Sequence, residues 1–450
     1  MKNLILAAAV ATALSVSAQA GAASPNSELS QIREQLESLM QRVDKLEQEN
    51  TQLKSENEAL KATDEKLEAQ GDYLKSEARG LRKESAQAAL EVGRVKDASK
   101  VAITGDVRYR YEMISDETLA AGGVQSTADR YRDRIRARLA ATVKATDNIT
   151  VGIGMTTTEA NDPRSGNQSL TGSFSKKSLD LDLAYFDWKF ASWGNLIGGK
   201  MKQPFIKPGQ SLFWDNDITP EGLALNFSSG MFFGTAYNYW INEVSGAENT
   251  RTADTMLRGL QVGARFPMGA NTLMLALHYY DLSAGQGRAP FYNNSSNGNT
   301  TVNVGTPATA VLAFDYEVID LSAEYNMMFG QTPFQIWADY AQNQDPSDLD
   351  TAWAAGVLFG KAGNYRTFEV GAGYQVVEKD ALFGQLIDSD FAGGNTDQEG
   401  WVLRAAYAPV RNWTLNTTYF LNKRNVDRPT SLGQRDIDYD RLQVDFNVKF

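Results

Sequence analysis

Hydrophobic and polar residues follow three different patterns along the 450-residue chain. Residues 1–20 contain one short apolar run, residues 29–81 follow a seven-residue repeat, and residues 100–450 alternate with a period of two. A period of seven indicates a helix with a coiled-coil seam, and a period of two indicates strands with one apolar face. The patterns therefore predict a short leader, a helical segment and a large β region.

The alternating region contains sixteen segments near the length that a tilted membrane-spanning strand needs, about 9–11 residues. They are expected near residues 101–112, 130–144, 148–157, 178–190, 195–203, 222–228, 231–242, 257–266, 272–282, 315–329, 333–341, 351–360, 366–377, 400–409, 413–422 and 440–450. Every second connection is short and carries turn residues, as in Ser228-Ser229-Gly230 and Gly330-Gln331-Thr332. The others are long, at 113–129, 158–177, 204–221, 243–256, 283–314, 342–350, 378–399 and 423–439.

Long loops on one side and short turns on the other are typical of a transmembrane barrel with both chain ends in the periplasm. A soluble β-sandwich has no reason to show this asymmetry. The expected fold class is therefore all-β, a 16-stranded antiparallel transmembrane β-barrel (residues 100–450), with an N-terminal α-helical coiled coil (residues 21–99).

The low average hydropathy agrees with a barrel. Mean hydropathy is −0.38, a value that resembles a soluble protein. A barrel wall alternates lipid-facing apolar and lumen-facing polar residues, which keeps the average low. No apolar run after residue 20 has the length of a spanning helix, so a closed barrel is the remaining way to cross a bilayer.

The N-terminus has the features of an export signal. Lys2 provides the positive start, residues 4–16 form the apolar core, and Ala18-Gln19-Ala20 fits a small-residue cleavage site. The alternative, a membrane anchor that is retained, requires a longer apolar core. We therefore predict a signal peptide over residues 1–20.

The C-terminus has the pattern of a final barrel strand. Leu442, Val444, Phe446, Val448 and Phe450 share one face and alternate with polar residues. A last strand that ends in Phe resembles the signal by which the barrel-assembly machinery recognises outer-membrane barrels. Phe446, Val448 and Phe450 are therefore expected to form this assembly signal.

Aromatic side chains lie near the ends of the expected strands, where they are typical of the two membrane interfaces. The candidates are Tyr109, Tyr185, Trp188, Tyr237, Tyr239, Tyr279, Tyr325, Tyr340, Trp401, Tyr407 and Tyr419. Ordinary strand aromatics are the alternative for any one of them.

The heptad segment has a continuous seam at its d positions, which include Leu39, Leu46, Leu53, Leu60 and Leu67. One helix alone gains little from such a seam, so association with further copies is expected. The a positions become polar from Asn50 onward. Asn at an a position is typical of two-stranded coils.

Composition argues against several other classes of protein. The net charge of −11 disfavours a nucleic-acid partner, and the absence of cysteine removes disulfides and thiolate metal sites. His278, the single histidine, lies within a strand and has no recognisable catalytic partner motif. We therefore expect no enzymatic activity, no cofactor and no metal site.

Three motifs carry a resemblance to a known family. They are 129–139 (DRYRDRIRARL), 199–205 (GKMKQPF) and 213–223 (FWDNDITPEGL). With them the chain resembles the bacterial outer-membrane putative-porin family and, more distantly, the phosphate- and polyphosphate-selective porins. The resemblance implies a homotrimer, in conflict with Asn50, and a third loop (204–221) that folds into the lumen and constricts it.

Charged residues on the expected strands and third loop are candidates for ion selection. The basic residues expected to line the pore are Arg108, Arg110, Arg130, Arg132, Arg134, Arg136, Arg138, Lys200 and Lys202. The arginines must face the lumen, because charge on the lipid side costs about 2–4 kcal/mol at mid-membrane depth. The loop adds Asp215, Asp217 and Glu221, and Asp180 and Asp182 alternate on one strand. A basic wall opposite an acidic loop predicts a transverse field and a weak preference for anions; arginines paired to carboxylates are the alternative.

The interpretation is a porin of the Gram-negative outer membrane, in contact with lipid and with its coiled coil in the periplasm, that lets small polar or ionic solutes diffuse passively. One alternative is an envelope-spacing or tethering protein, in which the barrel anchors a coiled coil that contacts the cell wall. Another is a surface adhesin that uses the polar loop 283–314.

Overall fold

The computed structural model describes residues 25–98, 100–125, 129–160, 162–243, 254–293, 295–305 and 308–450. In the helical segment it describes the side chains of residues 30–68, 70, 71 and 75. The predicted signal peptide lies outside the described residues. The chain divides into two compact units, Met1–Ala98 and Ser99–Phe450.

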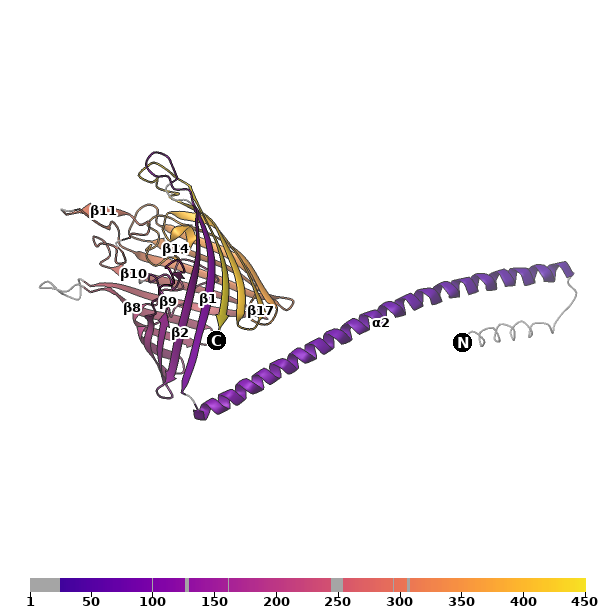
Figure 1. Cartoon of the computed structure of the whole chain (residues 1–450). Helices are drawn as coiled ribbons and strands as arrows, with labels where there is room; N and C mark the ends of the chain where they lie inside the picture. The colour runs from indigo at the N-terminus through magenta and orange to yellow at the C-terminus, as the bar shows by residue number, and fades with distance from the viewer. Residues whose placement is uncertain are drawn as a thin grey trace. The chain divides into compact units, whose positions relative to one another are not determined.

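The first unit contains one long helix, α2 (Pro25–Ala98), of 74 residues (Figure 1). At a rise of 1.5 Å per residue the helix is about 110 Å long, longer than the heptad pattern alone predicts. Its leucine seam is uncovered, since Leu39, Leu46, Leu53, Leu60 and Leu67 are each more than half exposed. Self-association of this helix stays a prediction.

No helix in the described part of the chain combines the length and apolar character that crossing a bilayer requires.

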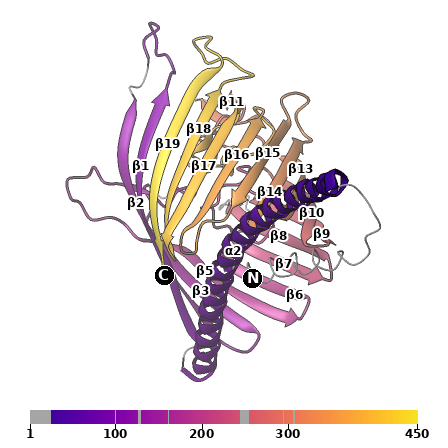
Figure 2. The same ribbon diagram turned by 90° about the vertical axis from the view of Figure 1, so that its right-hand side faces the viewer.

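The second unit is a closed antiparallel barrel (Figures 1 and 2). Its strands are β1 (Val101–Asp116), β2 (Arg130–Lys144), β3 (Ile149–Thr156), β5 (Asp180–Ala191), β6 (Gly194–Lys200), β7 (Glu221–Ser229), β8 (Phe232–Asn242), β9 (Thr255–Met268), β10 (Asn271–Ser283), β13 (Glu317–Phe329), β14 (Thr332–Asn343), β15 (Thr351–Gly360), β16 (Thr367–Val377), β17 (Gln398–Val410), β18 (Trp413–Arg424) and β19 (Ile437–Lys449). The two-residue β4 (Gln168–Ser169) adds a short piece beside β2. The ring closes because β1 pairs with both β2 and β19. The predicted sixteen-stranded antiparallel barrel is confirmed for the described residues.

The strand connections keep the predicted alternation of long and short. Two-residue turns join β7 to β8, β9 to β10 and β13 to β14. Gly230, Gly269 and Gly330 begin these turns with φ values of 60°, 67° and 64°, a region that residues with a Cβ rarely adopt. The long loop between β10 and β13 contains a hairpin that the sequence did not predict, β11 (Thr301–Val304) and β12 (Thr309–Leu312).

The wall is polar inside and apolar outside. On β1, Arg108 and Arg110 are buried, whereas the alternate residues Val107, Tyr109 and Tyr111 are exposed. This arrangement is the reverse of a soluble core and is typical of a membrane barrel with a polar lumen.

The main buried cluster lies inside the barrel and consists of wall residues, two inward loops, and Leu312 and Tyr316 of the loop between β10 and β13. Residues 201–220 contribute Phe205 and Trp214, and residues 378–397 contribute Leu382 and Ile387. Tyr237 and Tyr239 of β8 belong to this cluster and are 6% and 1% exposed. The prediction that these two tyrosines lie at the membrane interface is therefore wrong; they form the surface on which a loop packs.

The last strand closes the barrel and presents the predicted apolar face outward. Phe446, Val448 and Phe450 are 40%, 47% and 61% exposed. The backbone of Phe450 exchanges two hydrogen bonds with Gly105 on β1, at 2.9 and 3.0 Å. The role of these three residues in assembly stays a prediction.

Candidate functional site

Arginines of β1 and β2 form a basic block on the inner wall. Arg108 lies opposite Arg136, and Arg110 lies opposite Arg134, so two like-charged cross-strand pairs are neighbours. All four side chains are buried. Like charges that face one another in a sheet repel, and burial strengthens the repulsion. The block therefore requires carboxylates close by.

Two carboxylates lie against Arg110. Its Nε is 2.6 Å from Oδ1 of Asp445 on the neighbouring β19, and its Nη1 is 3.0 Å from Oδ2 of Asp390. Asp390 also pairs with Arg441 of β19. Although burial alone would raise it, Arg441 and Arg110 hold the pKa of Asp390 below its ordinary value. The positive charge of Arg110 is thus compensated by Asp445 and Asp390.

Carboxylates also lie against the arginines of β2. Asp106 is 3.0 Å from Arg136 and 2.6 Å from Arg138, and Asp217 is 3.4 Å from each of these arginines. Glu112 pairs with Arg132.

Of the nine predicted basic residues, seven have a carboxylate within 4.0 Å. Arg130, exposed at the outer end of β2, and Lys202 are the two without one in the described part of the chain. The positive charge of the basic wall is therefore largely compensated by neighbouring carboxylates.

Residues 201–220, between β6 and β7, fold against the inside of the opposite wall. The backbone of Ile206 exchanges two hydrogen bonds with the Gln261 side chain of β9, at 2.8 and 2.7 Å. Ser211 donates to Asp339 of β14 at 2.5 Å. The ring of Phe205 stacks on Tyr237, with centroids 5.6 Å apart. These contacts hold the predicted third loop inside the barrel.

The three acidic residues predicted at this loop have different surroundings. Asp217 approaches Arg136 and Arg138, as a basic wall opposite an acidic loop would require. Asp215 is 4% exposed and points to the other inward loop, where it accepts a hydrogen bond from the Ser389 N–H at 2.9 Å. Glu221 is exposed and pairs with Lys200 at 3.0 Å. Only Asp217 faces the arginine block.

Burial shifts the pKa of two groups on this loop. Burial, together with the nearby Asp388 and Asp217, raises the pKa of Asp215 well above its ordinary value. Burial lowers the pKa of Lys207 to about 8, although Asp215 and Asp388 oppose this change. The ammonium group of Lys207 donates to the carbonyl oxygen of Trp214 at 2.9 Å and to Asn216 at 2.6 Å.

A second inward loop, residues 378–397 between β16 and β17, was not predicted to enter the barrel. It contains a single 3₁₀ turn, η1 (Phe391–Gly393), and buries Phe383, Ile387 and Phe391. Those apolar side chains were an available signal, because a solvated loop is usually polar. The loop brings Asp390 to the arginine block.

Arg164, in the loop between β3 and β5, stabilises the second inward loop. Its Nη1 donates to the carbonyl oxygens of Gly384, Ile387 and Gly394 at 3.1, 3.4 and 3.0 Å. Its side chain is buried. The local sequence gives no signal for this role, because its partners lie more than two hundred residues away.

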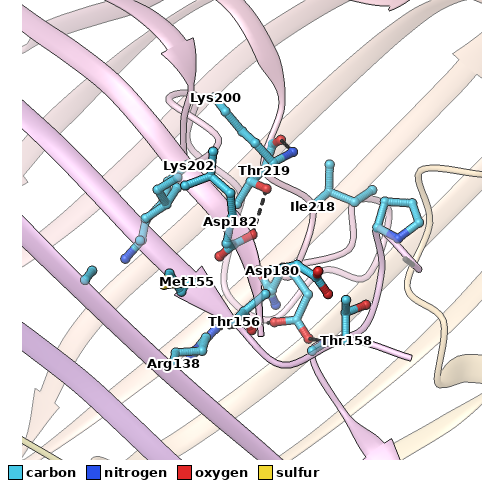
Figure 3. A pocket seen from close by; sticks show the side chains of 18 of the residues that line it. Arg138, Met155, Thr156, Thr158, Asp180, Asp182, Lys200, Lys202, Ile218 and Thr219 are labelled. Carbon is cyan, nitrogen blue, oxygen red and sulfur yellow. Dashed lines mark hydrogen bonds and ion pairs between the residues drawn. The ribbon is translucent and has the colours of Figure 1, made fainter. Parts of the chain in front are cut away.

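A cavity of about 990 Å³ lies beside the arginine block and the third loop (Figure 3). Its lining includes Arg138 of β2, Asp180 and Asp182 of β5, and Lys200 and Lys202 at the end of β6. Thr219 of the third loop donates to Asp182 at 2.9 Å. The cavity thus has charged groups of both signs on one wall.

His278 on β10 is buried among aromatic side chains. It is 1% exposed and lies among Phe205, Tyr237 and Tyr280, with its Nε2 2.9 Å from the hydroxyl oxygen of Tyr237. Within the described residues, no group of three or more His, Asp or Glu side chains is arranged to hold a metal ion.

A family model described as "Putative porin" matches residues 30–311 and 293–450. The chain belongs to this family, as the three motifs predicted. No curated protein shows significant similarity to the sequence.

Solved structures share the fold at low sequence identity. The high-pH structure of Pseudomonas putida OprB is 12% identical with a TM-score of 0.51, and the match covers 80% of this chain and 96% of that one. A loop L8 deletion mutant of Vibrio cholerae OmpT is 12% identical, with a TM-score of 0.46 and coverage of 78% and 100%. A triple mutant of Rhodopseudomonas blastica porin is 10% identical, with a TM-score of 0.41 and coverage of 78% and 100%. The OprB comparison supports the barrel fold.

Proposed function

We propose that this chain is an outer-membrane porin through which small polar or ionic solutes diffuse passively. The observation that carries the proposal is a closed barrel with a charged inner wall, an apolar outer face and a lumen cavity of about 990 Å³. A closed barrel satisfies its backbone hydrogen bonds in lipid, and a polar lumen can hold water. Membership of the porin family supports the same function.

The proposed path runs past the third loop. Residues 201–220 lie inside the barrel, and Asp217 comes within 3.4 Å of Arg136. We assign the constriction to this approach of loop and wall. Export by the signal peptide, recognition of Phe450 by the barrel-assembly machinery and assembly as a homotrimer are parts of the same proposal.

The proposed ion preference is a weak one for anions. Its support is the number of arginines on β1 and β2. Because most of them have a carboxylate within ion-pairing distance, the net field in the lumen is small. We therefore expect a small reversal potential with the sign of anion selectivity.

The experiment is single-channel recording of the purified protein in a planar bilayer under a roughly tenfold salt gradient. Steady openings that come in steps of three support a trimeric diffusion pore. A folded barrel that never conducts contradicts the porin function, and a clear cation preference contradicts only the ion preference.

A second candidate function, an envelope spacer, is favoured by one observation. The seam of α2 leaves Leu46, Leu53 and Leu60 54–66% exposed along a helix of 74 residues. Such a seam is stabilised when another helix covers it. In this function the helices associate in the periplasm and contact the cell wall, and the barrel serves as the membrane anchor.

A further inference from the structure

The cavity wall alternates in charge around the barrel. From β2 to β7, the charged residues that the strands and their ends contribute are Arg138, Asp180, Asp182, Lys202, Lys200 and Glu221. Figure 3 shows that the first five come from the β2, β5 and β6 region of the wall and surround one space. Asp106, Asp162, Lys207, Asp217 and Lys449 line the cavity as well. A wall of this kind has groups that can bind either sign of charge.

Most of these charges already have a partner in the protein. Arg138 pairs with Asp106 and Asp217, and Lys200 pairs with Glu221. Asp182 accepts the hydrogen bond of Thr219, so its charge is only partly satisfied. Pairing reduces the capacity of these groups to bind a charged solute.

Lys202 and Asp180 are different. Among the residues that the structure describes, no side-chain hydrogen bond or ion pair reaches either group, and both line the cavity. An ionised side chain without a partner at a water-filled wall can form a charge-assisted hydrogen bond to a solute of opposite charge. Lys449 of β19 also lines the cavity without a side-chain partner among the described residues. The cavity therefore offers the free ammonium groups of Lys202 and Lys449 and the free carboxylate of Asp180.

Lys202 and Asp180 come from neighbouring parts of the wall. Ala184 of β5 pairs with Lys200, the last residue of β6, and Lys202 follows two residues later. Figure 3 shows both side chains beside the same space. A solute with both charges can therefore form a charge-assisted hydrogen bond at each end.

We propose that this cavity selects zwitterionic solutes, such as α-amino acids and short peptides, with Lys202 binding the carboxylate and Asp180 binding the ammonium group. The inference rests on the proposed porin function. A neutral solute has no charge for either group, and a simple ion satisfies one group but not both. The cavity volume, about 990 Å³, leaves room for a solute of this size with water around it.

The test is a swelling assay with liposomes that contain the purified full-length protein. The probes are glutamine, a zwitterion, and arabinose, a neutral solute of similar mass, and the measured quantity is the ratio of their uptake rates at low concentration. Lys202→Gln and Asp180→Asn should each lower this ratio about two- to fivefold, the size expected of one lost exposed ion pair. Arabinose uptake should stay unchanged in both variants, which shows that the barrel folds.

Two further variants sharpen the test. Lys144→Gln and Asp147→Asn remove the same charges at the exposed β2–β3 turn, outside the cavity, and should leave the ratio unchanged. The charge exchange Lys202→Asp with Asp180→Lys should recover most of the ratio, because the zwitterion can bind in the opposite orientation.

The outcomes separate the inference from the function on which it rests. A ratio that stays at the wild-type value in Lys202→Gln and Asp180→Asn, with normal arabinose uptake, overturns the zwitterion site and leaves the porin standing. Absence of swelling with either solute in the wild-type protein overturns both.

Discussion

At the scale of single residues, the inner wall tolerates a dense group of arginines because each buried one lies close to a carboxylate. Most of these carboxylates belong to the wall, as Asp106 and Asp445 do. Asp217 belongs to the third loop, and it lies 3.4 Å from both Arg136 and Arg138. Asp106 alone would still hold these two arginines in place. Asp217 therefore adjusts the field in the lumen more than it stabilises the wall.

Replacing this aspartate should change ion selection. Asp217→Asn removes one negative charge beside Arg136 and Arg138, so the lumen becomes more positive and attracts anions. We expect the ratio of chloride to potassium permeability, measured from the reversal potential, to rise about two- to threefold, as a lost partly exposed ion pair would allow. Asp147→Asn, at a surface turn, is the control. An unchanged reversal potential would show that Asp217 does not face the ion path.

At the scale of elements, the two inward loops hold each other. The Asp215 N–H donates to the Leu386 carbonyl at 2.7 Å, and the Asp388 N–H donates to the Leu212 carbonyl at 3.1 Å. The side chain of Asp215 is buried at this junction, where Asp388 also raises its pKa and where burial raises the pKa of Asp388 itself. The carboxylates of Asp215 and Asp388 thus influence each other where the loops are joined, and Lys207 is close enough to be affected by both.

The contact between the two inward loops should be more stable at acidic pH. The native pKa of Asp215 is raised above the ordinary value of 3.8, so its contribution to stability is full below that value and is lost as the pH rises through the native pKa. We expect current flicker from loop movement to decrease as the pH falls below neutral. Asp215→Asn, which mimics the protonated form, should flicker little at neutral pH. Recordings at pH 7 and below keep Lys207 mostly protonated, because its pKa is about 8.

The wild-type protein recorded in parallel is the reference for this variant. If Asp215→Asn keeps the wild-type dependence of flicker on pH, the titrating group lies elsewhere in the lumen.

At the scale of the whole molecule, the chain joins a barrel with a polar inner wall to a helix whose leucine seam is exposed. The barrel closes on itself through β1 and β19, so it requires no second copy for its hydrogen bonds. The helix has no such closure, because its leucine seam stays exposed. Association of copies is therefore expected to depend on α2 more than conductance does.

Polar substitutions in the seam should separate these two properties. In the triple variant Leu46→Ser, Leu53→Ser, Leu60→Ser, loss of buried apolar surface should weaken association of the isolated full-length protein, measured by light scattering or cross-linking. Single-channel conductance should stay within about twofold of wild type, because the barrel wall is unchanged. The double variant Gln41→Ser, Gln48→Ser, on the opposite face of the heptad, is the control.

Deletion of residues 28–84 tests the second function in cells. A porin keeps its conductance after this deletion, whereas a spacer loses the attachment of the membrane to the cell wall.

Full association of the triple leucine variant would contradict a role for the seam in the association of copies.

The sequence shows which side chains share a face of a strand, and it therefore predicted that the arginines of β2 point inward. It could not predict the carboxylates that pair with the arginines, because Asp390 and Asp217 come from loops whose paths depend on the rest of the barrel. The error at Tyr237 and Tyr239 has another origin. They lie on the inward face of β8 with Phe233 and Thr235, and Phe205 packs on Tyr237 there. The burial of Asp215, two residues from Asp217, is a result of contact between two loops.

The sequence by itself determined the sixteen strands, their order around the barrel, and the side of β1 and β2 that faces the lumen. It could do so because alternation and turn chemistry are local properties, and because lipid rejects charge. Only the tertiary structure decided which loops enter the lumen, which charges are paired and which remain free. Those outcomes depend on distances between residues far apart in the chain, as between Lys202 and Asp180 across two strands, and no local pattern encodes such distances.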